Sequence, residues 1–187
     1  LEVDLITSVV GLTLFEDIFS MTISGTIAIA DSVNLASYGP LLGQEYLHLK
    51  ISTPTFKDES AVIDFSKNAF LVHSISNREK ITDGVQGFVL SFVSQELVRD
   101  QRSKVTQSLE GSWSDIVSKM LLNPNYLGTR KRIFIENTSG VKKFVAPNVR
   151  PLDIIKMATE QGVSNFKNES TFLFYETLKG FHYRTLA

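Results

Sequence analysis

Apolar and polar residues alternate along the first half of the chain, and this alternation most constrains the fold. The apolar face of the segment 21–29 consists of Met21, Ile23, Ile27 and Ile29. Successive side chains of a strand point to opposite faces of a sheet, so a period of two predicts a half-buried strand. Gly25 interrupts the apolar face. Because a glycine in such a pattern often marks a bulge or bend, it favours a curved barrel over a flat sheet.

Five further segments before residue 96 also have the pattern of strands. They are residues 11–18, 45–52, 61–65, 69–76 and 86–95. Residues 77–84, which are polar and end in Asp-Gly, are predicted to form the turn between the last two segments. Six strands without an amphipathic helix among them predict an antiparallel β-barrel or sandwich, and we expect a barrel over residues 1–104.

The pattern changes near residue 100, beyond which two segments have helical spacing. At the start of the first, Ser112 and Asp115 have the spacing of a capping box, and Pro124 ends the pattern. In the second, Pro151 suits the first helical position and Gly162 suits the C-terminal cap. Two helices are therefore predicted.

Three other segments complete the second part of the chain. Residues 98–111 are polar and are predicted to be a connector. Residues 130–147 are predicted to form a β-hairpin with its turn near residues 137–140, and residues 170–187 a second hairpin. We therefore expect residues 105–187 to form a small α+β domain.

The terminal hairpin is rich in aromatic residues, which could stack on nucleic-acid bases or form one wall of a core. Phe172 and Phe174 alternate with Leu173 and Tyr175, so the strand is apolar on both faces. A strand with two apolar faces is typical of a buried position. The hairpin is therefore predicted to belong to the core.

No arrangement of residues indicates catalysis, a cofactor or a metal. There is no cysteine, which excludes disulfides, thiolate metal sites and a cysteine nucleophile. The histidines, which are His48, His73 and His182, show no metal-ligand spacing. The glycines fit no phosphate-binding loop. We therefore predict a protein that is not an enzyme and has no cofactor, and a cell-wall hydrolase is a weaker alternative because no acid–base pair is evident.

A cluster of basic residues is the one local feature with a functional alternative. It consists of Arg130, Lys131, Arg132, Lys142 and Lys143. A hairpin would bring these residues onto neighbouring strands, where they could bind single-stranded nucleic acid together with the terminal aromatic residues. The net charge of −1 offers no general attraction to nucleic acid or to anionic membranes. We expect a solvated basic rim and keep an oligonucleotide- or carbohydrate-binding β-barrel as the alternative function.

The order of several stretches along the chain resembles that in the baseplate hub proteins of contractile-tailed bacteriophages. It is more distantly similar to the hub part of type VI secretion spike proteins. The stretches that carry the resemblance are residues 12–35 with 40–51, residues 87–117, residues 148–162 and residues 170–186. None of them is a catalytic signature, so the resemblance lies in their order.

This resemblance implies a structural role in the virion. Hub proteins of this family are barrels that assemble as threefold rings, join the tail tube to the central spike and form in the host cytoplasm. The implied partners are other copies of the chain, the tube protein and the spike protein. The net charge predicts no specific nucleic acid, and the lack of a stretch of about 18–20 apolar residues predicts no stable membrane insertion. In the family the chain continues beyond the aromatic hairpin, so the resemblance also implies that this sequence is truncated at its C-terminal end.

Overall fold

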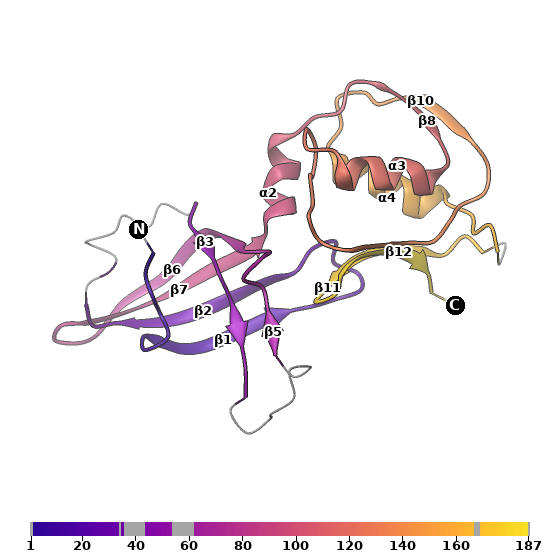
Figure 1. The fold of residues 1–187 in the computed structure, drawn as a ribbon. Helices are drawn as coiled ribbons and strands as arrows, with labels where there is room; N and C mark the ends of the chain where they lie inside the picture. The colour runs from indigo at the N-terminus through magenta and orange to yellow at the C-terminus, as the bar shows by residue number, and fades with distance from the viewer. Residues whose placement is uncertain (1, 34, 36–43, 54–61, 167–168, 187) are drawn as a thin grey trace. The chain divides into compact units, whose positions relative to one another are not determined.

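A computed structural model describes the chain apart from residues 1, 34, 36–43, 54–61, 167–168 and 187 (Figure 1). The chain forms two compact units. The first comprises Leu1–Phe15 and Ser24–Gln95, and the second comprises Glu16–Ile23 and Glu96–Ala187. The protein is mainly β with a smaller α+β part, as predicted. The predicted domain boundary after residue 104 stays a prediction.

The first unit contains a five-stranded antiparallel sheet in the order β1-β2-β7-β6-β3. Its strands are β1 (Val9–Phe15), β2 (Ser24–Asp31), β3 (Tyr46–Leu47), β6 (Phe70–Thr82) and β7 (Val85–Ser94). A separate antiparallel pair is formed by β4 (Lys50–Ile51) and β5 (Ile63–Asp64). The strand predicted over residues 45–52 is thus two short strands in different sheets. No pairing of β1 with β3 closes the sheet within the described residues, so the predicted barrel is seen as an open sheet.

One face of this sheet forms the core of the first unit. Its fully buried members come from three neighbouring strands: Ile27 and Ile29 on β2, Phe88, Leu90 and Phe92 on β7, and Phe70 and Val72 on β6. The ring centroid of Phe70 lies 4.9 Å from that of Phe92 and 4.6 Å from that of Phe65. The period of two along the sequence therefore identified the buried face correctly.

Gly25 lies on this buried face for a reason other than the predicted bulge. The pairing of β2 with β7 runs through Gly25 without a shift, and the irregularity between β1 and β2 lies between Val9 and Gly11. A Cβ atom on Gly25 would lie 2.5 Å from the carbonyl oxygen of Thr13 and would overlap the ring of Phe92. The glycine makes room for the Phe92 ring, and of the bulge or bend predicted at Gly25 the pairing shows no bulge.

The hairpin of β6 and β7 is longer than predicted. Strand β6 continues to Thr82 through most of the segment expected to be a turn, and the turn itself lies at Asp83 and Gly84. The residues of β6 beyond Ser74 are exposed, so this part of the strand has no buried face that would impose an apolar alternation. Register shifts after Ser76 accompany this irregular sequence.

The second unit combines three helices with two small sheets in the residues described. The helices are α2 (Gln95–Arg102), α3 (Trp113–Leu122) and α4 (Pro151–Gln161). The strands are β8 (Ser108–Gly111), β9 (Ile133–Ile135), β10 (Lys142–Val145), β11 (Phe172–Thr177) and β12 (Gly180–Thr185). They form the sheets β11-β12-β9 and β10-β8. None of the described helices has the length and apolar character needed to cross a membrane.

Helices α3 and α4 confirm the two predicted helices. The side chain of Ser112 accepts a hydrogen bond from the amide of Asp115, and the Asp115 carboxylate accepts one from the amide of Ser112, which completes the capping box. At α4, the N-cap residue Arg150 provides no side-chain hydrogen bond to the backbone. Asp100 of α2 takes this role, because its Oδ1 accepts a hydrogen bond of 2.7 Å from the amide of Leu152.

Two predictions for this unit are wrong. The segment 98–111, expected to be a connector, contains most of α2 and all of β8. The segment 130–147 is not a hairpin, because β9 pairs in parallel with β12 while β10 pairs with β8. The terminal hairpin of β11 and β12 forms as predicted.

Candidate functional site

Strand β1 is an edge of the five-stranded sheet and is apolar and exposed. Its partner β2 covers one side only, so alternate backbone N–H and C=O groups face away from the sheet. Val10 is 72% exposed and Phe15 is 54% exposed, and Val9 and Leu12 are also exposed. Leu12 lies opposite Ile27, on the buried face, so the apolar face of the sheet reaches solvent at this edge.

Apart from the irregularity between Val9 and Gly11, the sequence of β1 lacks the features that usually protect an edge strand. Val9–Phe15 contains no charged residue and no proline, both of which discourage pairing with another chain. The opposite edge strand, β3, is only two residues long. This difference makes β1 the edge of the described sheet best suited to pairing. The sequence predicted a strand here, but its edge position depends on long-range pairing that a local pattern does not show.

A buried network of charged side chains lies in the second unit. Lys131 Nζ is 2.7 Å from Glu96 Oε2 and 2.6 Å from Glu176 Oε1. The side chains of Lys131, Glu96 and Glu176 are 8%, 6% and 1% exposed. Thr129 Oγ1 donates a hydrogen bond to Glu96 Oε1, and the amide of Ile23 donates one to Glu176 Oε2. The network therefore joins α2, β11 and two connecting segments of this unit.

The five residues of the predicted basic surface do not lie on one hairpin. Lys131 is buried in the charged network, so its amine is not available to a ligand at the surface. Arg130 and Arg132, its neighbours in the sequence, are exposed. Lys142 and Lys143 are exposed on β10, and Lys143 Nζ lies 3.1 Å from Glu110 Oε2 of β8. Binding by the exposed members of the cluster stays a prediction.

The aromatic hairpin forms part of the core, as predicted. Its buried aromatic residues are Phe172, Phe174, Phe181 and Tyr183. The hydroxyl of Tyr183 donates a hydrogen bond of 2.8 Å to the carbonyl oxygen of Ala158 in α4, and burial raises the pKa of Tyr183. Helix α4 thus packs directly against this hairpin.

The other face of the same sheet carries a stack of three rings. The ring of His182 lies between Phe134 and Tyr175, with centroid distances of 4.7 Å and 5.1 Å. His182 Nε2 is 2.9 Å from Thr177 Oγ1. Burial, followed by the charge of Arg184, lowers the pKa of His182. The neutral imidazole is therefore favoured in the folded protein. Within the described residues, no group of three or more acidic or histidine side chains is arranged to hold a metal ion.

Comparison with known proteins reveals a shared fold. No protein-family model and no curated protein matches the chain. A solved structure with a similar fold is the 43 kDa tail protein of prophage MuSo2 from Shewanella oneidensis, with a TM-score of 0.57 and 7% sequence identity. The similarity covers 94% of this chain and 50% of the prophage protein, so the chain spans half the length of that neighbour. Over nearly all of its length, the chain therefore has a fold like that of a prophage tail protein.

Proposed function

We propose that the chain is a structural, non-enzymatic component of a phage tail, and specifically of the baseplate hub. In this proposal copies of the chain assemble as a ring, a homotrimer, that joins the tail tube to the central spike of the virion. The similarity in fold to a prophage tail protein supports the tail assignment. The proposed partners are other copies of the chain and the tube and spike proteins.

The observation that carries the ring assembly is the unprotected edge strand β1. An edge strand can pair with a strand of a second copy, which satisfies its outward backbone groups and buries its apolar side chains. Burying one exposed Val, Leu or Phe side chain completely contributes about 1.5–3 kcal/mol. Val10, Leu12 and Phe15 are 72%, 36% and 54% exposed, so each would contribute part of this free energy, in addition to the backbone pairing.

The experiment is a measurement of mass in solution for the protein expressed from its complete gene. Sedimentation velocity and light scattering should show a trimer. Val10→Lys places a charge on the edge and should convert the trimer to a monomer while the circular dichroism spectrum is unchanged. Val33→Lys, at another exposed position of the same unit, is the matched control and should remain trimeric.

Two results would contradict the proposal. A strictly monomeric wild-type protein without affinity for tube or spike proteins would exclude a hub ring. A trimer that tolerates Val10→Lys would show that β1 is not the interface. The alternative of an oligonucleotide- or carbohydrate-binding module receives less support, because Lys131 of the basic cluster is buried in ion pairs.

A further inference from the structure

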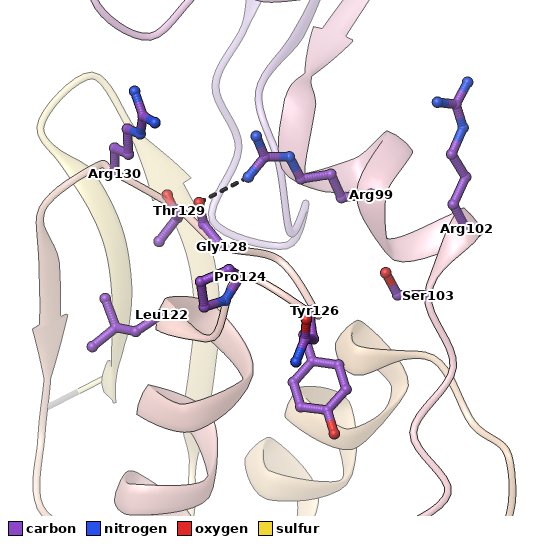
Figure 2. A pocket seen from close by; sticks show the side chains of 10 residues that line it. Arg99, Arg102, Ser103, Leu122, Pro124, Tyr126, Gly128, Thr129 and Arg130 are labelled. Carbon is purple, nitrogen blue, oxygen red and sulfur yellow. Dashed lines mark hydrogen bonds between the residues drawn. The ribbon is translucent and has the colours of Figure 1, made fainter.

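A pocket of about 570 Å³ in the second unit is rich in arginine (Figure 2). It lies between α2 and the turn that follows α3. Its lining includes three arginines, from two separate segments, and no acidic residue: Arg99 and Arg102 of α2, and Arg130. We call this the arginine pocket.

The guanidinium of Arg99 is held in place by the backbone of the turn. Its Nη1 donates a hydrogen bond of 2.9 Å to the carbonyl oxygen of Leu127. It donates another of 2.8 Å to that of Gly128 (Figure 2). A guanidinium has five N–H donors, and Nη1 carries two of them, so three remain for a ligand. Gly128 has a φ of +51°, and a Cβ atom there would lie 3.0 Å from Arg99 Nη1. The glycine thus allows the arginine to approach the turn closely.

The positive charge of the pocket is not neutralised by the acidic residues of α2. Glu96 binds Lys131 and Thr129, and Asp100 binds the amide of Leu152. Within the described part of the chain, no ion pair involves any of the three arginines. Helix α2 therefore uses its carboxylates within the unit and presents Arg99 and Arg102 to the pocket.

The pocket also has an apolar wall. Leu122, Pro124 and Tyr126 line it, and Leu122 is 52% exposed. A ligand that matches both features carries an oxyanion next to an apolar group. A carboxylate fits the planar fork of an arginine and can accept two parallel hydrogen bonds from it.

We propose that the arginine pocket binds an acidic peptide segment of a partner protein. Glu or Asp carboxylates bind the separate arginines, and a neighbouring apolar side chain packs against Leu122 and Tyr126. Single-stranded nucleic acid is disfavoured, because the net charge of the chain is −1 and the site is a local pocket rather than a basic groove along which a phosphate backbone could run. This binding site is independent of the ring proposed above, since it uses no residue of β1.

The test is fluorescence anisotropy with the 187-residue chain and a short labelled peptide of Glu and Leu residues at low ionic strength. Binding should be lost with salt and with a peptide in which Gln replaces Glu. The double variant Arg102→Gln with Arg130→Gln should raise the Kd about tenfold, because each exposed arginine contributes up to about 1 kcal/mol through its ion pair and about 1.4 kcal/mol is tenfold. Both arginines are outside the core, so circular dichroism should show an unchanged fold.

A matched control removes two positive charges elsewhere in the same unit. Lys142 and Arg184 are exposed and lie outside the pocket, so the pair Lys142→Gln with Arg184→Gln should change the Kd by no more than about twofold. Equal weakening by the two double variants would overturn the proposal. It would also be overturned by undetectable binding of the peptide, by equal binding of the Gln peptide, or by tighter binding of a single-stranded oligonucleotide of equal charge.

Discussion

Replacing Lys131 by Met should destabilise the second unit strongly. Methionine keeps most of the length of the lysine side chain but removes the amine that lies within 2.7 Å of both Glu96 and Glu176. Two carboxylates with side chains 6% and 1% exposed would then lose their shared cation. The replacement therefore isolates the loss of charge from the loss of packing.

The expected size follows from the burial of the network. Removing one partner of a buried ion pair costs about 3–5 kcal/mol, because the remaining charge is left without compensation. For a chain of this size, each kcal/mol corresponds to a shift in Tm of about 2–4 °C, so the Tm should fall by about 6–20 °C. Exposed ion pairs, in contrast, contribute only about 0–1 kcal/mol.

The assay is urea unfolding followed by tryptophan fluorescence. Trp113 is the one tryptophan of the chain and is buried in the second unit, so its emission reports on the unit that contains the network. The triple variant Glu96→Gln, Lys131→Met and Glu176→Gln is the matched control. It should recover most of the lost stability, because the neutral amide oxygens still accept hydrogen bonds from Thr129 and Ile23. A decrease of less than about 1 kcal/mol in the free energy of unfolding of Lys131→Met would refute the reasoning, because the network would then contribute no more than exposed ion pairs do.

Two further predictions concern the sheet of the first unit and the ring stack of the second. Gly25→Ala should lower the stability of the first unit by about 1–3 kcal/mol, because its Cβ would overlap the Phe92 ring, whereas Gly11→Ala meets only Ala28 at 4.0 Å and should have little effect. Hydrogen exchange of the β2 amides measures both, and equal protection in the two variants would contradict the prediction. The pKa of His182 is lowered from 6.5, so between the folded pKa and about 6.5 the unfolded chain binds more protons than the folded one. The free energy of unfolding should therefore rise with pH across this window and fall as the pH is lowered through it. Trp113 fluorescence in urea at several pH values should show this slope reduced in His182→Gln, and an unchanged slope would assign it to other groups.

Features set by neighbouring residues were predictable from the sequence. Ser112 and Asp115 identified the start of α3 because a capping box depends only on residues three positions apart. The buried face of β2 was predictable for the same reason, since its period of two is local. The role of Gly25 was not, because the ring that it accommodates belongs to β7, far away in the sequence.

Features set by long-range pairing were not predictable in this way. Helix α2 has no apolar stripe, and its buried residues include Glu96 and Asp100, whose partners lie in later segments. A polar segment with buried acidic residues is therefore predicted to be a connector when the partners of those residues are unknown. Likewise, β9 pairs with β12 rather than with β10, and nothing in residues 130–147 specifies that partner. The arginine pocket depends on α2, so its residues could not be grouped beforehand.

The short segment Glu16–Ile23 has a consequence for how the chain can be divided. It connects β1 to β2 of the first unit, yet it belongs to the second, where the Ile23 amide binds Glu176 and Glu16 Oε2 accepts a hydrogen bond from the amide of Leu178. The backbone thus crosses from one unit to the other at residues 15–16, 23–24 and 95–96. A single protease cut near residue 95 would not separate the two units, because residues 16–23 of the second unit would stay on the N-terminal fragment. The C-terminal fragment would then lack the Ile23 amide that donates a hydrogen bond to Glu176. A gene fragment that encodes only residues 96–187 would also lack residues 16–23. Expression of the complete second unit therefore requires both segments.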